Sequence, residues 1–345
     1  MARNQNTERQ QAIKRGLEFV YEIACDPDNM ERYGHDLLGC FDCLQSTSRD
    51  PSLVSTARRM GRERARRWRR EHAQLTDQLT ADDIADLVFG CLAADRLGVV
   101  DDGFKNGLHG VAQRFRAEDY FGFDAVNEPP PHDEPDECEC GASNKRGRKR
   151  CHNCKRYLSM LSRYAVFVDG LTRGYHGERY GIRLGAPFSD VIKWMPVMRP
   201  YPTYKHEDDP DFYWAIYAVT HVVYTLNDYS FYKLSPRDLP DEYAFLKANL
   251  RNVVEMEDAE SMGEFLDSLK AFDQASDEAL ITEGEDFLLA NQNADGSWGS
   301  LSTHDIYQRY HPTWTAIDGL REYAWWGGLR SRKELRRILS GRNDE

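Results

Sequence analysis

The chain has 345 residues, of which 41% are hydrophobic and 12% aromatic, and its formal net charge at pH 7 is −12. This length and apolar content suffice for one large core or two moderate ones. No run of about 18 apolar residues occurs, so we expect no membrane-spanning helix. The acidic balance argues against a protein whose whole surface binds nucleic acid. The first ten residues lack the apolar stretch of a signal peptide, which predicts a cytoplasmic protein.

Hydrophobic residues recur at helical spacing through most of the chain. Intervals of three and four residues predict N-terminal helices over residues 8–125 and further helices over 157–330, followed by a charged tail over 331–345. Residues 212–226 are almost entirely apolar or aromatic, so this helix should be buried on all sides. No strand pairs are evident. The predicted fold class is all-α.

The segment 126–156 differs in kind from the helical sequence on either side. It combines a Pro-Pro-Pro run, an acidic stretch and a basic tract with four of the eight cysteines. Cys138 and Cys140 form one pair, and Cys151 and Cys154 form another after ten intervening residues. Two such pairs resemble the knuckles of a zinc ribbon and can supply four thiolates to one tetrahedral Zn²⁺. We therefore expect a structural zinc ion that holds together an insertion with no core of its own.

The stretch from residue 284 to residue 298 carries a recognisable motif. Its defining members are Gly284, Phe287, Leu288, Gln292, Gly296 and Trp298. This pattern resembles the QW motif of squalene and oxidosqualene cyclases. It suits a joint between helices, because the glutamine amide can satisfy backbone groups at a helix terminus and the tryptophan can stack against it.

Residues 310–320, with the sequence YHPTWTAIDGL, are similar to the Tyr-His…Ser-Gly-Leu segment of protein prenyltransferase β subunits. Both families fold as α/α toroids, in which inner and outer helices alternate around a central cavity. The resemblance therefore implies an (α/α)6-type toroid. It does not extend to the chemistry, because the chain lacks the Asp-x-Asp-Asp acid motif of class II cyclases and the late cysteine of the prenyltransferase zinc site.

One face of the predicted helix over residues 212–228 carries large side chains that end in polar groups. Its members, at offsets of three and four, are Trp214, Tyr217, His221, Tyr224 and Asp228. In a toroid an all-apolar helix would be an inner one, so this face should line the cavity. We predict His221 as a ligand or base, and Tyr217 and Tyr224 as groups that orient substrate or donate protons. Asp228 would add a catalytic carboxylate.

Two more histidines follow near the C-terminus. His311 precedes a proline, a favoured first helical residue, so it should lie at a helix start, where the helix dipole keeps the imidazole neutral. His304 lies seven residues earlier in a predicted loop. With His221 these residues would form a three-imidazole site for Zn²⁺, Cu or Fe, with Glu264 or Asp228 as an added carboxylate. A metal-free general base and purely structural histidines are the alternatives.

The tract from Arg58 to Arg70 holds eight arginines and one glutamate. We interpret it as an outer helix whose charges pair with the acidic excess elsewhere, or as a subunit interface of a homo-oligomer. A helix that binds nucleic acid or a membrane surface is the alternative.

Three functions follow from these patterns. The favoured one is an enzyme, a metal-dependent oxidoreductase or a lyase or cyclase, that acts on a small apolar or aromatic molecule in the central cavity, as in natural-product biosynthesis. Many of the 18 tyrosines and 7 tryptophans lie between Trp194 and Trp326, where they would line such a cavity and stabilise cationic intermediates. The alternative, ordinary packing of a large helical core, accounts for most of them. The alternatives are a terpenoid cyclase or prenyltransferase proper, and a non-catalytic binding module that uses the zinc insertion and the basic patches.

Overall fold

The computed structural model describes residues 2–131, 138, 140–145, 150–155, 162–205 and 209–340. The predicted insertion and the predicted charged tail are therefore described only in part. Within these ranges the chain is mostly helical, and the all-α prediction is confirmed at this level. The exception is a pair of two-residue parallel strands, β1 (Tyr232–Lys233) and β2 (Gly328–Leu329), with Tyr232 opposite Gly328.

The helices before the insertion are α1 (Ala2–Cys25), α2 (Pro27–Thr47), α3 (Pro51–Glu71), α4 (Ala81–Arg96), α5 (Asp102–Ala112) and α6 (Ala117–Phe121). After it come α7 (Arg163–Tyr180), α8 (Phe188–Ile192), α9 (Met195–Met198), α10 (Pro210–Asn227), α11 (Pro240–Glu255) and α12 (Ala259–Phe272). A 3₁₀ turn, η1 (Ala275–Asp277), leads into α13 (Glu278–Ala290), and α14 (Tyr307–Leu320) and α15 (Arg332–Ser340) complete the chain.

Helix starts follow the local chemistry of the sequence. Asp26 and Asp50 accept hydrogen bonds from the first-turn amides of α2 and α3, and each is followed by proline at the first helical position. Thr80 and Asp83 form a capping box at α4, where each side chain accepts a hydrogen bond from the other residue's backbone amide. These caps satisfy amides that have no partner within the helix.

The sequence-based start of α14 was wrong. We expected this helix to start at His311 and Pro312, but α14 begins at Tyr307 and ends at Leu320. The Asp305 carboxylate accepts a hydrogen bond from the Tyr307 amide at 3.1 Å, so the helix starts more than a turn before the proline. His311 consequently lies inside the helix and not at its start.

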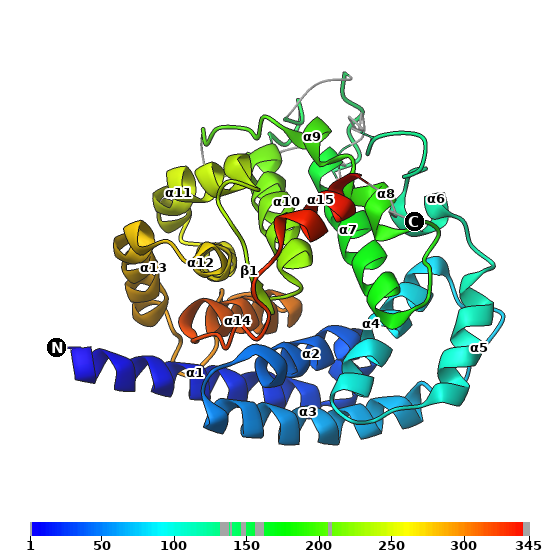
Figure 1. The fold of residues 1–345 in the computed structure, drawn as a ribbon, viewed down its shortest axis with the longest axis horizontal. Helices are drawn as coiled ribbons and strands as arrows, with labels where there is room; N and C mark the ends of the chain where they lie inside the picture. The colour runs from blue at the N-terminus through cyan, green and yellow to red at the C-terminus, as the bar shows by residue number, and fades with distance from the viewer. Residues whose placement is uncertain are drawn as a thin grey trace.

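Six helices contact one another in a closed cycle. In order around it they are α2, α4, α7, α10, α12 and α14, and α14 contacts α2 again. Figure 1 shows α1, α3, α5, α11 and α13 outside this cycle. Helix α10 lies between α7 and α12 and is buried along most of its length, as its apolar sequence predicts.

Helices α12 and α14 make the closest approach in the cycle. Gly263 of α12 lies against the backbone of α14, and a Cβ atom added there would overlap the Thr315 carbonyl. On the other side, a Cβ added to Gly319 would lie 3.0 Å from the Gly263 Cα atom. Two glycines therefore allow the two backbones to touch.

The loop after α13 joins three elements. The Trp298 indole is fully buried and donates a hydrogen bond to the Leu288 carbonyl in the last turn of α13, at 2.8 Å. The Gln292 amide donates to the carbonyls of Ala12 in α1 and of Gly296, both at 2.9 Å. The tryptophan, and not the glutamine as we expected, thus satisfies the carbonyl at the helix terminus. The glutamine instead ties the turn to α1.

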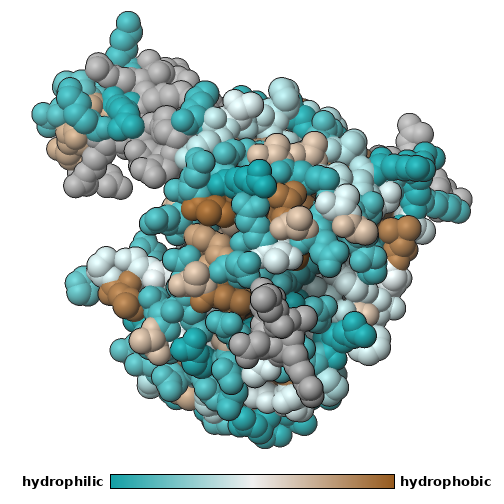
Figure 2. Space-filling view, turned by 90° about the vertical axis from the view of Figure 1, so that its left-hand side faces the viewer, coloured by the Kyte–Doolittle hydropathy of each residue, from teal (hydrophilic) through white to brown (hydrophobic). Residues whose placement is uncertain are grey.

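The face in Figure 2 is largely hydrophilic, with apolar residues gathered in patches near its middle. Helix α3 packs on α2 and exposes the arginines of its outer side. Part of this charge is neutralised as predicted, since Arg69 pairs with Asp95 at 2.6 Å and Arg67 with Glu71 at 2.7 Å. None of the helices in the described ranges combines the length and apolar composition needed to cross a bilayer.

The α12–α14 contact generates a stability prediction. Gly263→Ala should lower the free energy of unfolding by about 1–3 kcal/mol, because the added methyl group forces the two backbones apart. Urea denaturation monitored by circular dichroism measures the change. Gly110→Ala is the control, because Gly110 is exposed within α5 with no atom near its Cβ position, and alanine there should stabilise the helix by about 0.5–1 kcal/mol. Equal effects of the two substitutions would contradict the close contact.

Candidate active-site cavity and cysteine cluster

A cavity lies inside the cycle of six helices, and every one of them contributes lining residues. It contains about 600 Å³ of space that protein atoms do not fill, part of it open to solvent. The ionisable side chains of its wall are Asp36, Cys43, His176, His221, Glu264, Asp267, His311, Asp318 and Arg321. Its aromatic wall consists of Phe89, Tyr224, Tyr229 and Trp314.

His311 forms an ion pair with a glutamate that the sequence did not single out. Its Nδ1 atom lies 2.9 Å from Glu260 Oε1, across the α12–α14 contact. Burial disfavours the imidazolium, but the Glu260 carboxylate outweighs it and raises the pKa of His311 to about 9. His311 is therefore a cation at neutral pH. The prediction of a neutral imidazole is corrected, because a tertiary ion pair and not the helix dipole sets its charge.

Glu260 also accepts a hydrogen bond from Tyr217. The Tyr217 hydroxyl donates to Glu260 Oε1 at 2.6 Å, and its oxygen lies 2.8 Å from that of Tyr213. The sequence predicted Tyr217 as a group that orients substrate, but it is absent from the cavity wall. It holds Glu260, and through Glu260 it positions His311.

His221 of α10 is a neutral imidazole on the wall of the same cavity. Its Nδ1 atom lies 2.9 Å from the Tyr217 carbonyl, to which it donates a hydrogen bond. Burial lowers the pKa of His221 to about 4, and the charge of His311 adds to this effect. Since Nδ1 carries the proton, the Nε2 lone pair remains for accepting a proton or binding a ligand.

Two buried carboxyl groups line the cavity on α12. Glu264 is 2% exposed and accepts a hydrogen bond from the Thr220 hydroxyl at 2.6 Å. Burial raises the pKa of Glu264 to about 8, so it carries a proton at neutral pH. Asp267 accepts a hydrogen bond from Ser230 at 2.8 Å, and burial together with the charge of Asp318 raises its pKa to about 7.

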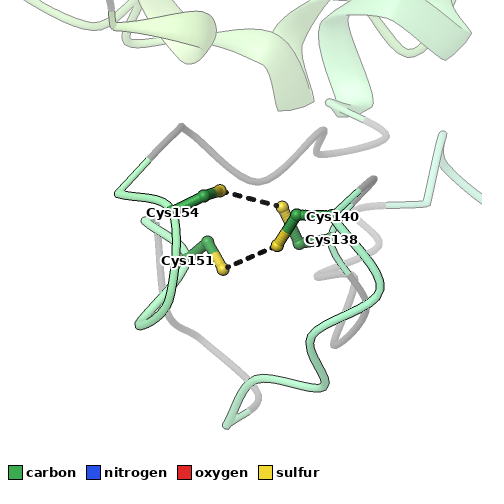
Figure 3. Close-up of side chains that lie close together, drawn as sticks. All are labelled: Cys138, Cys140, Cys151 and Cys154. Atoms are coloured by element: carbon green, nitrogen blue, oxygen red, sulfur yellow. Dashed lines mark hydrogen bonds between the residues drawn. The ribbon is translucent and has the colours of Figure 1, made fainter.

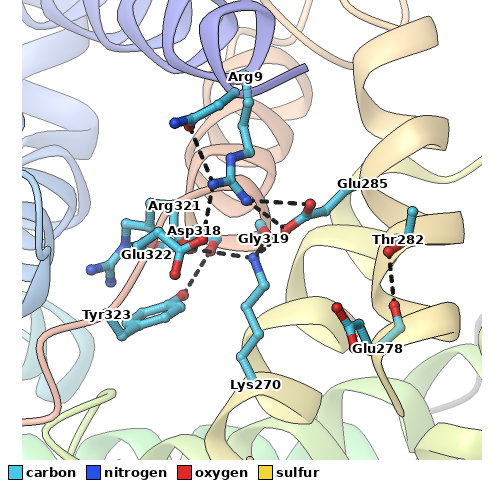
Figure 4. Close-up of polar contacts among 11 residues, drawn as sticks. Arg9, Lys270, Glu278, Thr282, Glu285, Asp318, Gly319, Arg321, Glu322 and Tyr323 are labelled. Atoms are coloured by element: carbon cyan, nitrogen blue, oxygen red, sulfur yellow. Dashed lines mark hydrogen bonds and ion pairs between the residues drawn. The ribbon is translucent and has the colours of Figure 1, made fainter. Parts of the chain in front are cut away.

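A polar network fixes the C-terminal end of α14, where Asp318 and Arg321 reach the cavity (Figure 4). Lys270 donates hydrogen bonds to the carbonyls of Gly319 and Arg321 and pairs with Glu285 at 2.7 Å. The Arg321 guanidinium bonds to Asp318 Oδ1 at 2.6 Å. The lysine thus satisfies carbonyls that the helix leaves without partners, and the cavity end of α14 is held in place.

The remaining predicted site residues fall in different places. Tyr224 lines the cavity as expected. Asp228 ends α10 and pairs with Arg179, whose Nε atom lies 2.8 Å from its carboxylate, and it is not part of the cavity wall. His304 is exposed on the loop before α14. It does not join His221 and His311, so the described side chains do not form the predicted three-imidazole site.

Several groups that the sequence analysis passed over line the same cavity. His176 lies on α7, for which no site was proposed, and Asp318 lies seven residues after His311 on α14. Cys43 of α2 also reaches the cavity wall, while Cys40 is buried. For Glu260 and Asp267 a signal was available. Together with Glu264 they occupy one face of α12, at offsets of three and four.

The four cysteines of the insertion converge as their spacing predicts (Figure 3). All four sulfur atoms lie within 4.8 Å of one another. The Cys138 and Cys154 sulfurs are 3.5 Å apart, and those of Cys140 and Cys151 are 3.6 Å apart. Four thiolates at about 2.3 Å from a tetrahedral Zn²⁺ would be about 3.8 Å apart, so the cluster fits a metal centre.

Backbone turns shape both halves of the cluster. The Gly141 amide donates a hydrogen bond to the Cys138 carbonyl at 2.7 Å, and the Lys155 amide donates to the Cys151 carbonyl at 3.1 Å. Both residues adopt left-handed backbone conformations, with φ of 78° and 65°. In the described part of the chain, no other set of three or more His, Cys, Asp or Glu side chains is close enough to hold a metal ion.

No protein-family model, curated protein or solved structure matches this chain. The functional argument therefore starts from the two sites described above.

The cysteine cluster should bind one metal ion per chain. We expect elemental analysis of the purified protein to find one zinc, lost in Cys151→Ser because three thiolates bind Zn²⁺ more weakly than four. Cys25→Ser removes an exposed thiol outside the cluster and should leave the metal content unchanged. A protein free of metal after expression in zinc-supplemented medium would contradict the assignment.

The ion pair of His311 and Glu260 predicts how stability depends on pH. Because the native pKa of His311 is raised from 6.5 to about 9, its contribution is complete below pH 6.5 and is lost as the pH rises through 9. The contribution is about 3 kcal/mol. In Glu260→Gln the difference in unfolding free energy from the wild type should therefore be largest near pH 6.5 and shrink towards pH 9.5. Parallel pH profiles from urea denaturation would contradict the ion pair.

Proposed function

We propose that the protein is an enzyme that carries out acid–base chemistry on a small molecule with an apolar or aromatic body, in the central cavity of an α/α toroid. The closed cycle of α2, α4, α7, α10, α12 and α14, with further helices outside it, supports the toroid. The acidic and basic side chains of the cavity wall support the assignment as an enzyme.

One observation carries the proposal. A neutral imidazole, His221, and a protonated carboxyl group, Glu264, line the same buried cavity from neighbouring helices. Proton transfer requires an unprotonated base and a protonated acid at the same pH. The two environments in this cavity provide both groups. His221 is then the general base and Glu264 the general acid.

His311 would have an electrostatic role. Its imidazolium is held by Glu260 and faces the cavity, so it can stabilise negative charge that develops on a substrate oxygen. Glu260 and Tyr217 are positioning residues, because they act on the substrate through His311.

The reaction class is an isomerisation, elimination or cyclisation. Glu264 donates its proton to one substrate atom, His221 Nε2 removes a proton from another, and exchange with solvent restores both groups. The step is redox-neutral and needs no metal. The metal-assisted version of the hypothesis would instead use the Nε2 atoms of His221 and His311, whose Nδ1 atoms are held by a carbonyl and a carboxylate as in metal-binding histidines. It predicts a second metal ion per chain.

For the cysteine cluster we propose a structural Zn²⁺ in a zinc-ribbon-like insertion. Four protein ligands complete the coordination of the ion and leave no position for substrate. The cluster would stabilise a segment that the helical body does not pack.

The proposed function is tested by following metabolites. Purified protein incubated with a small-molecule cell extract should deplete at least one compound and produce an isomer or an elimination product of it, detected by untargeted mass spectrometry. His221→Asn and Glu264→Gln should each slow the conversion by at least about 100-fold, the usual contribution of a general acid or base.

His304→Ala is the matched control, since it removes an exposed histidine outside the cavity. Its conversion rate should equal that of the wild type. Absence of any conversion, or equal rates in His221→Asn and His304→Ala, would reject the enzyme hypothesis in this form.

A further inference from the structure

The cavity wall has more acidic groups than basic groups to neutralise them. Four carboxyl groups line it, on Asp36, Glu264, Asp267 and Asp318. The cationic groups at neutral pH are Arg321 and His311. Charge on buried side chains requires compensation, so the distribution of these groups indicates what a ligand must supply.

Both cations of the wall already have carboxylate partners. Arg321 pairs with Asp318 at 2.6 Å, and His311 pairs with Glu260 at 2.9 Å. Glu260 itself is not part of the cavity wall, so the charge of His311 is balanced from behind. Neither cation forms a direct ion pair with Asp36 or Asp267, although the charge of Arg321 also acts on Asp267 and that of His311 on Asp36.

Asp36, Glu264 and Asp267 form no ion pair with the described side chains. Their hydrogen-bond donors are neutral hydroxyls, with Tyr310 bound to Asp36 at 2.9 Å and Ser230 to Asp267 at 2.8 Å. Glu264 is assigned as the general acid and keeps its proton. Asp36 and Asp267 therefore remain as carboxyl groups with no direct ion-pair partner among the described side chains.

Aromatic rings complete the same wall. Tyr224 and Tyr229 lie with ring centroids 5.9 Å apart, and Trp314 and Phe89 line the cavity from α14 and α4. The faces of aromatic rings attract cations, and rings combined with carboxylates form the usual binding site of ammonium groups. A neutral apolar ligand would gain from the rings but would leave the two aspartates uncompensated.

We infer that the cavity is selective for a small organic cation, an ammonium or quaternary ammonium group on an apolar body, with Asp36 and Asp267 as its counter-ions. This inference rests on the proposed function, because it names the substrate class of the same cavity. The aromatic side chains would contact both the apolar body of the ligand and its cationic group.

Isothermal titration calorimetry with matched probes tests the inference. The cations are tetramethylammonium, choline and benzyltrimethylammonium, and the neutral probe is 3,3-dimethylbutan-1-ol, which has the shape of choline without its charge. We expect at least one cation to bind, and choline or a larger cation to bind at least about tenfold more tightly than the alcohol. Asp267→Asn and Asp36→Asn keep the hydroxyl hydrogen bonds but should each weaken cation binding by about tenfold or more, with no change for the alcohol.

Asp305→Asn removes a carboxylate outside the cavity wall and is the control with unchanged affinity. Equal affinity for choline and the alcohol, or absence of binding by all three cations at millimolar concentration, would overturn the inference. The two proposals can be rejected independently. If the protein converts a neutral metabolite but binds no cation, only the inference of a cationic substrate is rejected. If it binds a cation but converts no metabolite, the enzyme hypothesis is rejected and the protein is a binding protein.

Discussion

The backbone contact between α12 and α14 is the constraint on which the cavity depends. Gly263 and Gly319 let the two helices touch, and this contact places Glu260 and Glu264 opposite His311. A side chain at Gly263 would overlap the Thr315 carbonyl and push the two helices apart. Lys270 and the network around the end of α14 hold the other end of the contact (Figure 4). The protonation states of the cavity are therefore a consequence of packing.

Burial then divides the ionisable groups into two kinds. A group that meets an opposite charge keeps its own charge, as His311 does beside Glu260. Burial removes the charge of His221, which donates to a carbonyl, and of Glu264, which accepts from a hydroxyl. Side chains of ordinary acidity and basicity thus become a cation, a free base and a protonated acid within one space. This separation of roles, and not any single residue, makes the cavity a candidate catalytic centre.

The cysteine cluster and the cavity were predictable to different degrees because their geometry has different origins. Cys138 and Cys154 are 16 residues apart, and short turns bring them together, so spacing alone predicted the cluster. The cavity combines residues from Asp36 to Arg321, whose proximity depends on how six helices close. Of the predicted stripe on α10, His221 and Tyr224 line the cavity, whereas Asp228 pairs with Arg179 at the end of the helix.

By itself, the sequence determined the helices, the buried character of α10 and the convergence of the four cysteines, because each depends on periodicity or spacing within a few turns of chain. Only the tertiary structure decided the charge of His311, the separation of His304 from the other histidines and the place of Glu260. The physical reason is that an ion pair or a desolvated carboxyl group depends on neighbours that are about 50 residues away along the chain. No local pattern records which helix will supply them.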